Sequence, residues 1–290
     1  MSTLDSAGPI VNDKSHLQKE GNSYYTADEE SSDLTNNAHK KDSDYTEPIT
    51  HIKNKSFCER LCGPFCCQGK TKLTHDELVA FYKLKEDASI MIPRDSEEYD
   101  HILRKLWGLL STETLDKIED KRWQNYGFQN PNPRSDFRGA GLLSLNQLVY
   151  FSSTYPLLVA SMCEPSYQFL YAVSSINVTF FLVKFYHLSD DISLPRDKKE
   201  IATRKGLKSF CVMLDEDPEI LNRIHGMLLT DLFNLWVDFQ KNNSGVTLMD
   251  FSIVLKTLKK KFRKATKKSC TNFEELALRY ASIKFKKPKK

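Results

Sequence analysis

The feature that most constrains this chain is a set of apolar residues at helical spacing, which recurs from residue 74 onwards. Three of these segments open with Thr-x-x-Glu or Thr-x-x-Asp, a signature in which two side chains cap the free backbone N–H groups of a helix. They begin at Thr74, Thr247 and Thr271. Alternating β-branched runs bounded by hairpin turns, which would predict strands, are scarce. We therefore expect an all-α protein.

Helical spacing also predicts helices over residues 99–110, over 115–123 and after Leu142. Asp217 and Pro218 have the residue types of an N-cap and a first-turn proline, so they predict the start of another helix. The helices together are long enough to enclose a substantial core.

The most apolar segment, residues 166–186, is interrupted by polar side chains such as Gln168, Asn177 and Lys184. A membrane span needs about 20 predominantly apolar residues. A helix buried inside a helical bundle therefore explains this segment better than a membrane span.

The chain divides by composition into four parts. Its first 50 residues carry ten Asp and Glu against four Lys and Arg, with few large apolar side chains. Such a segment buries too little surface to offset the entropy of ordering. We expect a disordered acidic leader at 1–55, a cysteine-rich segment at 56–73, one compact multi-helix domain at 74–265, and a short C-terminal helix with a basic tail at 266–290.

The cysteine-rich segment leaves two interpretations open. Its cysteines lie near apolar and basic residues, which is compatible with lipidation on a cytosolic membrane face, and equally with a loop of unmodified thiols. A structural zinc site usually has two close pairs of ligands separated by a longer loop, so we expect no metal site. The four cysteines are Cys58, Cys62, Cys66 and Cys67.

The beginning of the chain and the number of cysteines favour the cytoplasm. The residues after Met1 carry charges where a signal peptide has its hydrophobic region. Seven cysteines fit reduced thiols better than a disulfide scaffold. We expect a cytoplasmic protein, with peripheral contact to a cytosolic membrane face as a further expectation.

The C-terminal part is strongly basic, with fourteen Lys and Arg against two Glu in residues 256–290. A basic surface indicates an acidic partner, and near anionic lipid each such charge adds about 1 kcal/mol. The alternative is an ordinary solvated helix face. Nucleic acid is not expected as a partner, because few aromatic residues are interleaved with the charges. The candidates for membrane contact are Lys256, Lys259, Lys260, Lys261, Arg263 and Lys264.

No complete enzyme active site is apparent from the motifs. The chain has no G-x-S-x-G, H-E-x-x-H or Walker sequence. The segment from His187 to Asp191 is expected to end a helix rather than to bind a metal. His75 and His225 are expected at the surface or at the edge of the core.

One loop is the candidate site. Arg138 lies between a phenylalanine and a glycine, in a stretch that contains prolines and the glycines Gly139 and Gly141. A guanidinium is permanently charged, so it cannot act as a general base, but its forked donors can stabilise charge that develops on a phosphate. The residues alone leave open that Arg138 pairs with Asp136 or caps a helix end. The apolar side chains that would anchor the loop are Trp123, Phe128, Phe137 and Leu142.

These residues resemble the signature of the ELMO domain family, W-x3-G-F-Q-x3-P-x-T-D-F-R-G-x-G-x3-L-x2-L-x-Y-F. Only the threonine position differs, since Ser135 stands there and keeps the hydroxyl. The pattern is long and therefore specific, and the similarity covers about residues 74–262. The matching residues are Trp123, Gly127, Phe128, Gln129, Pro133, Asp136, Phe137, Arg138, Gly139, Gly141, Leu145, Leu148, Tyr150 and Phe151.

The resemblance implies a fold and a function. The ELMO domain-containing branch is all-helical, keeps the D-F-R-G arginine and activates Arf and Arf-like GTPases, which act in membrane traffic. The larger ELMO scaffolds, which partner DOCK exchange factors, lack that arginine. The resemblance therefore implies a GTPase-activating protein in which Arg138 acts in trans. The residues that would support its loop are Asp136, Gln129, Trp123, Gly127, Phe128, Phe137, Gly139 and Gly141.

In this interpretation the chain has no cofactor of its own, because GTP and the magnesium ion belong to the partner GTPase. Asp136 would orient the arginine or hold its loop, and Gln129 would be structural. The alternative is a non-catalytic adaptor that binds a small GTPase or a DOCK-type exchange factor. Whether the chain contributes to catalysis depends on that choice.

Overall fold

A computed structural model describes residues 73–189 and 201–284. Within these ranges all regular secondary structure is helical, so the prediction of an all-α fold is confirmed. The expectations for the leader at 1–55, for the cysteines at 58–67 and for the end of the basic tail lie outside the described residues. The elements, with 3₁₀ helices marked η, are α2 (His75–Ser89), α3 (Asp100–Leu110), η2 (Lys121–Tyr126), η3 (Pro133–Gly139), α4 (Gly141–Thr154), α5 (Pro156–Met162), η4 (Pro165–Tyr167), α6 (Tyr171–Tyr186), α7 (Arg204–Glu216), α8 (Ile220–Asn242), η6 (Leu248–Asp250), α9 (Phe251–Ala265) and α10 (Phe273–Ser282).

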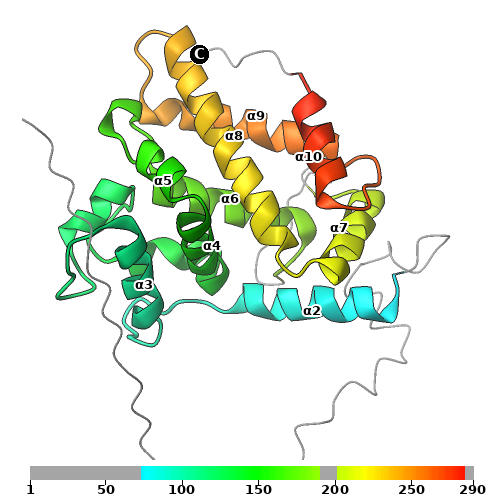
Figure 1. Cartoon of the computed structure of the whole chain (residues 1–290), viewed down its shortest axis with the longest axis horizontal. Helices are drawn as coiled ribbons and strands as arrows, with labels where there is room; N and C mark the ends of the chain where they lie inside the picture. The colour runs from blue at the N-terminus through cyan, green and yellow to red at the C-terminus, as the bar shows by residue number, and fades with distance from the viewer. Residues whose placement is uncertain (1–72, 190–200, 285–290) are drawn as a thin grey trace, which may run out of the picture. The chain divides into compact units, whose positions relative to one another are not determined.

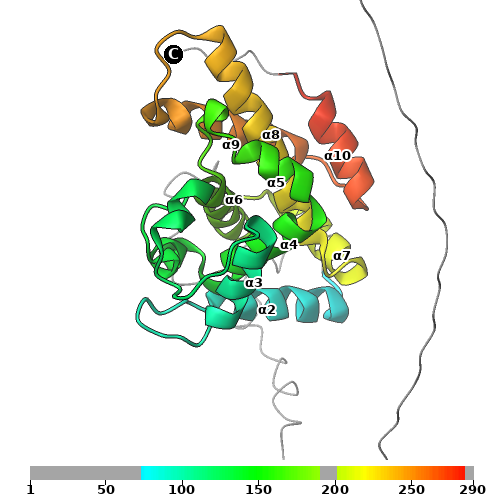
Figure 2. The same cartoon turned by 60° about the vertical axis from the view of Figure 1, so that its left-hand side comes forward.

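The centre of the fold is formed by α4 and α6: α4 contacts α2, α3, α5, α6 and α8, and α6 contacts α4, α8 and η3. In Figure 1, α2 lies across the lower ends of α4 and α7, and α9 and α10 are neighbours of α8; Figure 2 shows the same elements after a turn of 60°. Most side chains of α6 are buried and apolar, as expected for a helix inside a bundle. No helix in the described ranges is both long and apolar enough to cross a membrane.

Two of the three predicted capping signatures are confirmed. The Thr74 hydroxyl accepts a hydrogen bond from the backbone N–H of Glu77 (3.2 Å), and the Glu77 carboxylate accepts one from the backbone N–H of Thr74 (2.8 Å). The signature at Thr247 forms the same capping box before η6 and α9. The third prediction is wrong by one residue, because the side chain of Asn272 rather than that of Thr271 caps α10.

The predicted helix over residues 166–186 starts later than expected. Pro165 opens the short η4, and Gln168 then takes a left-handed conformation with φ 47°. α6 begins only at Tyr171. The left-handed residue breaks the helical path, although the apolar pattern runs through it.

Two other helix predictions are corrected by the structure. Asp217 is the C-terminal cap of α7, and its carboxylate accepts a hydrogen bond from the backbone N–H of Glu219 (2.9 Å), so α8 begins at Ile220 rather than at Pro218. The expected helix over 115–123 is a loop followed by the short η2. α7 was not predicted, although its N-cap Thr203 has the expected residue type.

A group of polar side chains crosses the apolar interior where α4, α6 and α8 meet. We call it the polar seam: Gln147, Ser175, Thr179 and His225, all fully buried. The Thr179 hydroxyl donates to the Gln147 side-chain carbonyl (2.6 Å), and the Ser175 hydroxyl lies 3.1 Å from Nε2 of His225. Burial lowers the pKa of His225 to about 4, so the ring is neutral at pH 7. The expectation that His225 lies at the surface or core edge is therefore wrong.

Candidate functional site

The signature loop, which we define as residues 123–141, is anchored by a row of aromatic rings. Trp123, Phe128 and Phe137 are buried, and successive ring centroids lie 5.0 and 6.1 Å apart in edge-to-face arrangement. Trp107 of α3 continues the row at 4.9 Å from Trp123. The indole N–H of Trp123 donates to a backbone carbonyl (2.7 Å), so the buried ring leaves no donor unpaired. The row fixes the loop to the helical body.

Two glycines of the signature loop lie where no side chain fits. Gly127 and Gly141 have left-handed φ values of 82° and 48°. A Cβ on Gly127 would lie 2.5 Å from the backbone at the start of α6, and a Cβ on Gly141 would lie 2.0 Å from the carbonyl oxygen of Ile90. The loop therefore touches both α6 and the chain that leaves α2, and only glycine permits the contact.

Asp136 holds the backbone of the signature loop. Its carboxylate accepts a hydrogen bond from the backbone N–H of Gln129 (2.7 Å) and another from the Ser135 hydroxyl (3.3 Å). Burial raises the pKa of Asp136, while hydrogen bonds from Gln129, Ser135 and Asn130 and the charge of Arg138 act in the opposite direction. The side chain of Gln129 is exposed, so Gln129 supports the loop through its backbone.

A second arginine of the loop, Arg134, has a structural position. Its Nε and Nη2 atoms lie 2.9 and 2.5 Å from one carboxylate oxygen of Asp100, the first residue of α3. The two side chains are only 9% and 19% exposed. Removing one partner of a buried ion pair leaves the other charge uncompensated. The pair was not predicted, because its members are 34 positions apart and share no local pattern.

Arg138 has a different position, four residues along the same chain. It is exposed and lies near the end of η3. Within residues 73–189 and 201–284 its side chain has no hydrogen bond or ion pair. In these ranges Arg138 neither forms an ion pair with Asp136 nor caps a helix end, although its charge acts to lower the pKa of the Asp136 carboxyl. The loop therefore presents one permanently charged fork to its surroundings.

Two residues outside the signature contact the loop beside Arg138. The Ile90 carbonyl accepts a hydrogen bond from the backbone N–H of Leu142 (2.8 Å), and the ring of Phe180 lies against Gly139. Sequence reasoning missed both. A glycine pattern indicates that some atom approaches closely, but it does not say which distant segment supplies that atom.

The predicted membrane-contact residues divide into separate groups on α9. Lys256, Lys260 and Lys264 are exposed at spacings of four residues. Lys259 is half-buried, with its ammonium 5.5 Å from the Phe181 ring centroid, and Arg263 is also partly buried. Lys261 does not share the exposed face, because its ammonium pairs with Asp231 at 3.1 Å and is only 14% exposed.

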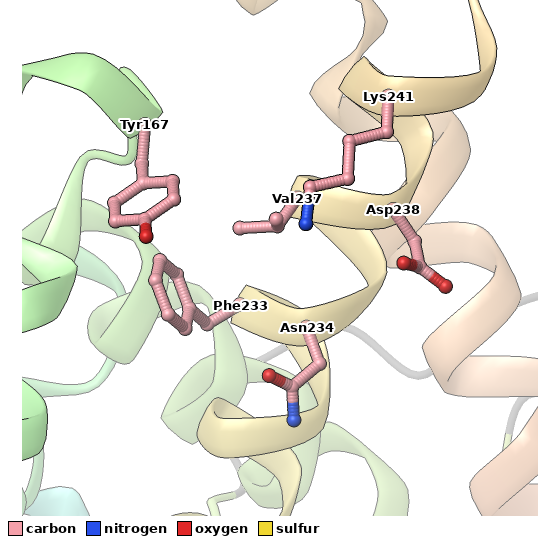
Figure 3. Close-up of a pocket in the computed structure, with 6 residues that line it drawn as sticks. All are labelled: Tyr167, Phe233, Asn234, Val237, Asp238 and Lys241. Carbon is pink, nitrogen blue, oxygen red and sulfur yellow. The ribbon is translucent and has the colours of Figure 1, made fainter.

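Other parts of the described structure are weaker candidates for a functional site. A pocket of about 360 Å³ lies elsewhere, and no residue of the signature loop lines it. Figure 3 shows its lining residues. No three His, Cys, Asp or Glu side chains in the described ranges are grouped so that they could hold a metal. His187 ends α6 in a left-handed conformation, as expected for the close of a helix. The pocket is lined by Tyr167, Phe233, Asn234, Val237, Asp238 and Lys241.

Comparison with known proteins agrees with the signature. ELMO domain-containing protein C of Dictyostelium discoideum is 24% identical over 189 residues, which are 65% of this chain and 29% of that protein. ELMO domain-containing protein 2 of Homo sapiens is 39% identical over 94 residues, 30% of this chain and 32% of that protein. The same protein of Mus musculus is 39% identical over 137 residues, 44% of this chain and 46% of that protein.

The chain thus matches less than half of the length of each of these relatives. No solved structure matches it. A model of the ELMO/CED-12 family matches residues 82–255, which is more than half of the chain and includes the whole signature loop. From the signature, the helical fold and this match together, the chain belongs to the ELMO/CED-12 family.

Proposed function

We propose that this protein is a GTPase-activating protein for Arf and Arf-like GTPases, in the branch of the family that uses the D-F-R-G arginine. The observation that carries the proposal is Arg138, an exposed guanidinium with no hydrogen bond or ion pair in the described part of the chain. The nearby Arg134 shows what a structural arginine looks like here, since it is buried and paired. An unpaired charge held on a fixed loop is suited to a partner.

The proposed chemistry follows from charge. During GTP hydrolysis, negative charge spreads over the oxygens of the transferring phosphoryl group. Arg138 enters the nucleotide site of the GTPase in trans and places its N–H donors on that charge, which raises kcat by about 10³ to 10⁵. GTP, magnesium and the residue that orients water come from the GTPase, so Arg138 completes an active site rather than forming one.

The rest of the signature loop supports catalysis by restricting the motion of the backbone that carries Arg138. The hydrogen bond from Gln129 to Asp136, the Arg134–Asp100 pair and the aromatic row fix the backbone that precedes Arg138. The hydrogen bond from Leu142 to Ile90 fixes the backbone that follows it. A donor that is already positioned loses little entropy when it meets the transition state. We therefore assign Asp136 to loop support, because its carboxylate accepts from the backbone of Gln129.

The test is GTP hydrolysis under single-turnover conditions with a panel of Arf and Arf-like GTPases loaded with GTP. We expect acceleration of at least one of them and a loss of about 10³-fold or more for Arg138→Ala. Arg138→Lys keeps the charge but loses the fork, so most of the acceleration is lost too. Lys105→Ala removes another exposed cation and serves as the control. Acceleration by Arg138→Ala equal to wild type would refute the proposal.

The competing function is a non-catalytic adaptor that binds a small GTPase or a DOCK-type exchange factor. The family membership is compatible with it, but an adaptor gives no reason for an exposed arginine that forms no hydrogen bond or ion pair with the described residues. It predicts binding that survives Arg138→Ala, with hydrolysis unaffected by wild type. The same assay therefore separates the two functions.

We also propose that the protein works at the cytosolic face of a membrane, with the outer face of α9 toward anionic lipid. Lys256, Lys260 and Lys264 form a row on that face. Leu248 and Met249, 47% and 87% exposed, lie in the 3₁₀ turn that leads into the helix. A row of cations beside exposed apolar side chains suits a surface of anionic headgroups.

Vesicle sedimentation tests this location. We expect the protein to bind phosphatidylcholine vesicles that contain phosphatidylserine, more weakly as salt rises. Replacing the three lysines by glutamate should lower the partition coefficient by about 100-fold or more, because each lost positive charge costs about 1 kcal/mol and each new carboxylate is repelled by the anionic lipid. Lys261→Glu is not a suitable control, since it breaks the pair with Asp231; Lys105→Glu on α3 is. Equal binding of wild type and the triple variant would exclude this surface.

A further inference from the structure

Two exposed apolar side chains belong to the segment that packs against Gly141, shortly after the arginine. Ile90 and Met91, which follow α2, are 37% and 48% exposed. Their backbone is pressed against the loop: a Cβ on Gly141 would be 2.0 Å from the Ile90 carbonyl oxygen and 3.1 Å from the Met91 Cα. The hydrogen bond from Leu142 to Ile90 (2.8 Å) locks the contact. The apolar pair is therefore fixed beside Gly141, three residues along the chain from Arg138.

An aromatic side chain lies next to Gly139, the residue that follows the arginine. The Phe180 ring of α6 is half-buried, and a Cβ on Gly139, the residue after Arg138, would lie 3.1 Å from its Cδ2 atom. The Lys184 ammonium lies 4.3 Å from the centroid of the same ring. A cation held over an aromatic face at this distance is attracted by the ring quadrupole. A second positive charge thus accompanies the ring.

Both groups therefore contact the three residues that follow Arg138. Protein interfaces are typically held by a few central residues, among which arginine and aromatic residues are enriched, and these are surrounded by side chains that exclude water. Arg138 and Phe180 have the residue types of such central residues, and Ile90 and Met91 are apolar side chains that could exclude water near them. The rigid contacts of Gly139 and Gly141 mean that this arrangement exists before any partner binds.

We propose that Ile90, Met91, Phe180 and Lys184 form the surface onto which the GTP-bound GTPase docks, so that they set its affinity while Arg138 sets the rate. This inference rests on the proposed function. The occupant is a folded GTPase whose nucleotide supplies the anion for Arg138 and whose surrounding surface is apolar with acidic groups that complement Lys184. Burying Ile90, Met91 and Phe180 against the GTPase excludes water from the guanidinium and strengthens its interaction with phosphate.

The experiment separates affinity from rate. The hydrolysis rate is measured at increasing concentration of this protein, which gives a half-saturating concentration and a maximal rate. Met91→Asp should raise the half-saturating concentration about tenfold or more with little change in the maximal rate. Lys184→Glu should do the same without removing a buried side chain. Arg138→Ala should show the opposite pattern, with a reduced maximal rate.

The matched control is Leu278→Asp, which places the same charge on a 74% exposed leucine of α10. It should leave both kinetic quantities unchanged. Circular dichroism and thermal unfolding check that each variant is folded. Binding to the same GTPases loaded with a non-hydrolysable GTP analogue gives a second readout, in which Met91→Asp and Lys184→Glu should weaken binding about tenfold or more.

The outcomes distinguish the two proposals. Acceleration with an unchanged half-saturating concentration for folded Met91→Asp and Lys184→Glu overturns the docking surface and leaves the function. Binding that is weakened by these variants, without any acceleration by wild type, supports the surface and removes the catalytic role. Neither binding nor acceleration with any GTPase of the panel overturns both.

Discussion

Hydrogen bonds support both the signature loop and the polar seam, but the two regions treat an ionisable side chain in opposite ways. In the loop, Asp136 and the aromatic row hold the backbone so that the permanently charged side chain of Arg138 stays exposed. In the seam, Ser175 and its neighbours enclose His225, which stays neutral and buried. One region keeps a charge in contact with the surroundings, and the other prevents one from forming.

The difference shows that stability and function are separable in this domain. Side chains that fix the loop from within, such as Arg134, should matter for folding as much as the seam does. Arg138 should matter hardly at all for folding, because its side chain is exposed and forms no hydrogen bond or ion pair with the described residues. Four changes test this division, from the largest expected effect on stability to the smallest.

Gly141→Ala should cause the largest loss, about 4 kcal/mol or more of unfolding free energy, because it adds a clash to a left-handed backbone. The new Cβ would lie 2.0 Å from the Ile90 carbonyl oxygen. Gly245→Ala is the matched control, since Gly245 has φ 61° but nothing within 4 Å of its Cβ position. It should cost about 1 kcal/mol. Equal losses in urea denaturation would mean that the loop does not press on Ile90.

The second largest effect is expected for Arg134, and it should differ clearly from the effect of changing Arg138. Arg134→Ala leaves Asp100 without its partner, and we expect a loss of about 3 kcal/mol. Arg138→Ala removes an exposed side chain and should change the unfolding free energy by less than about 0.5 kcal/mol. Urea denaturation of both variants measures the contrast. A stability loss for Arg138→Ala close to that for Arg134→Ala would contradict the division.

The polar seam should make stability depend on pH. The pKa of His225 is lowered to about 4, whereas an unfolded histidine titrates near about 6.5. Between these values the unfolded chain binds a proton that the folded chain does not, so unfolding is favoured as pH falls. Above about pH 6.5 the histidine causes no loss of stability. As the pH falls from there to about 4, the unfolding free energy decreases by about 3 kcal/mol.

The measurement is the unfolding free energy of wild type and His225→Asn across this pH window. The slope should be shallower for the variant, because asparagine does not titrate. Identical slopes would show that His225 does not differ in protonation between the folded and unfolded chains.

The smallest expected effect concerns the loop hydrogen bond. Asp136→Ala leaves the backbone N–H of Gln129 without its acceptor and should cost about 1 to 2 kcal/mol. Gln129→Ala keeps that N–H and should change stability by less than about 0.5 kcal/mol. Thermal unfolding compares the pair, and a larger loss for Gln129→Ala would assign the side chain of Gln129 a role that the structure does not give it.

Much of the fold could be predicted because its signals are local. The capping box of Thr74 and the apolar spacing act within a few residues of where the helix begins. The errors occur where a turn competes with a helix over the same residues. Asp217 hydrogen-bonds two positions ahead, and Gln168 takes a left-handed conformation, so α8 and α6 both start later than their apolar patterns.

The candidate site was only partly accessible from sequence. Arg138 and Asp136 belong to one contiguous pattern, so the order of residues along the chain is enough to single them out. Asp100, Ile90 and Phe180 come from α3, the end of α2 and α6. Tertiary packing alone brings them to the loop, and no spacing rule within the chain encodes it.

The aromatic row also allows the loop to be followed by intrinsic tryptophan fluorescence. The chain has three tryptophans, and two of them, Trp107 and Trp123, lie in the row with their rings 4.9 Å apart. Intrinsic emission from this protein should thus be dominated by the region that anchors the signature loop. Local opening there would shift the emission to longer wavelength while far-ultraviolet ellipticity stayed constant, which provides a label-free report on the loop during any encounter with another molecule.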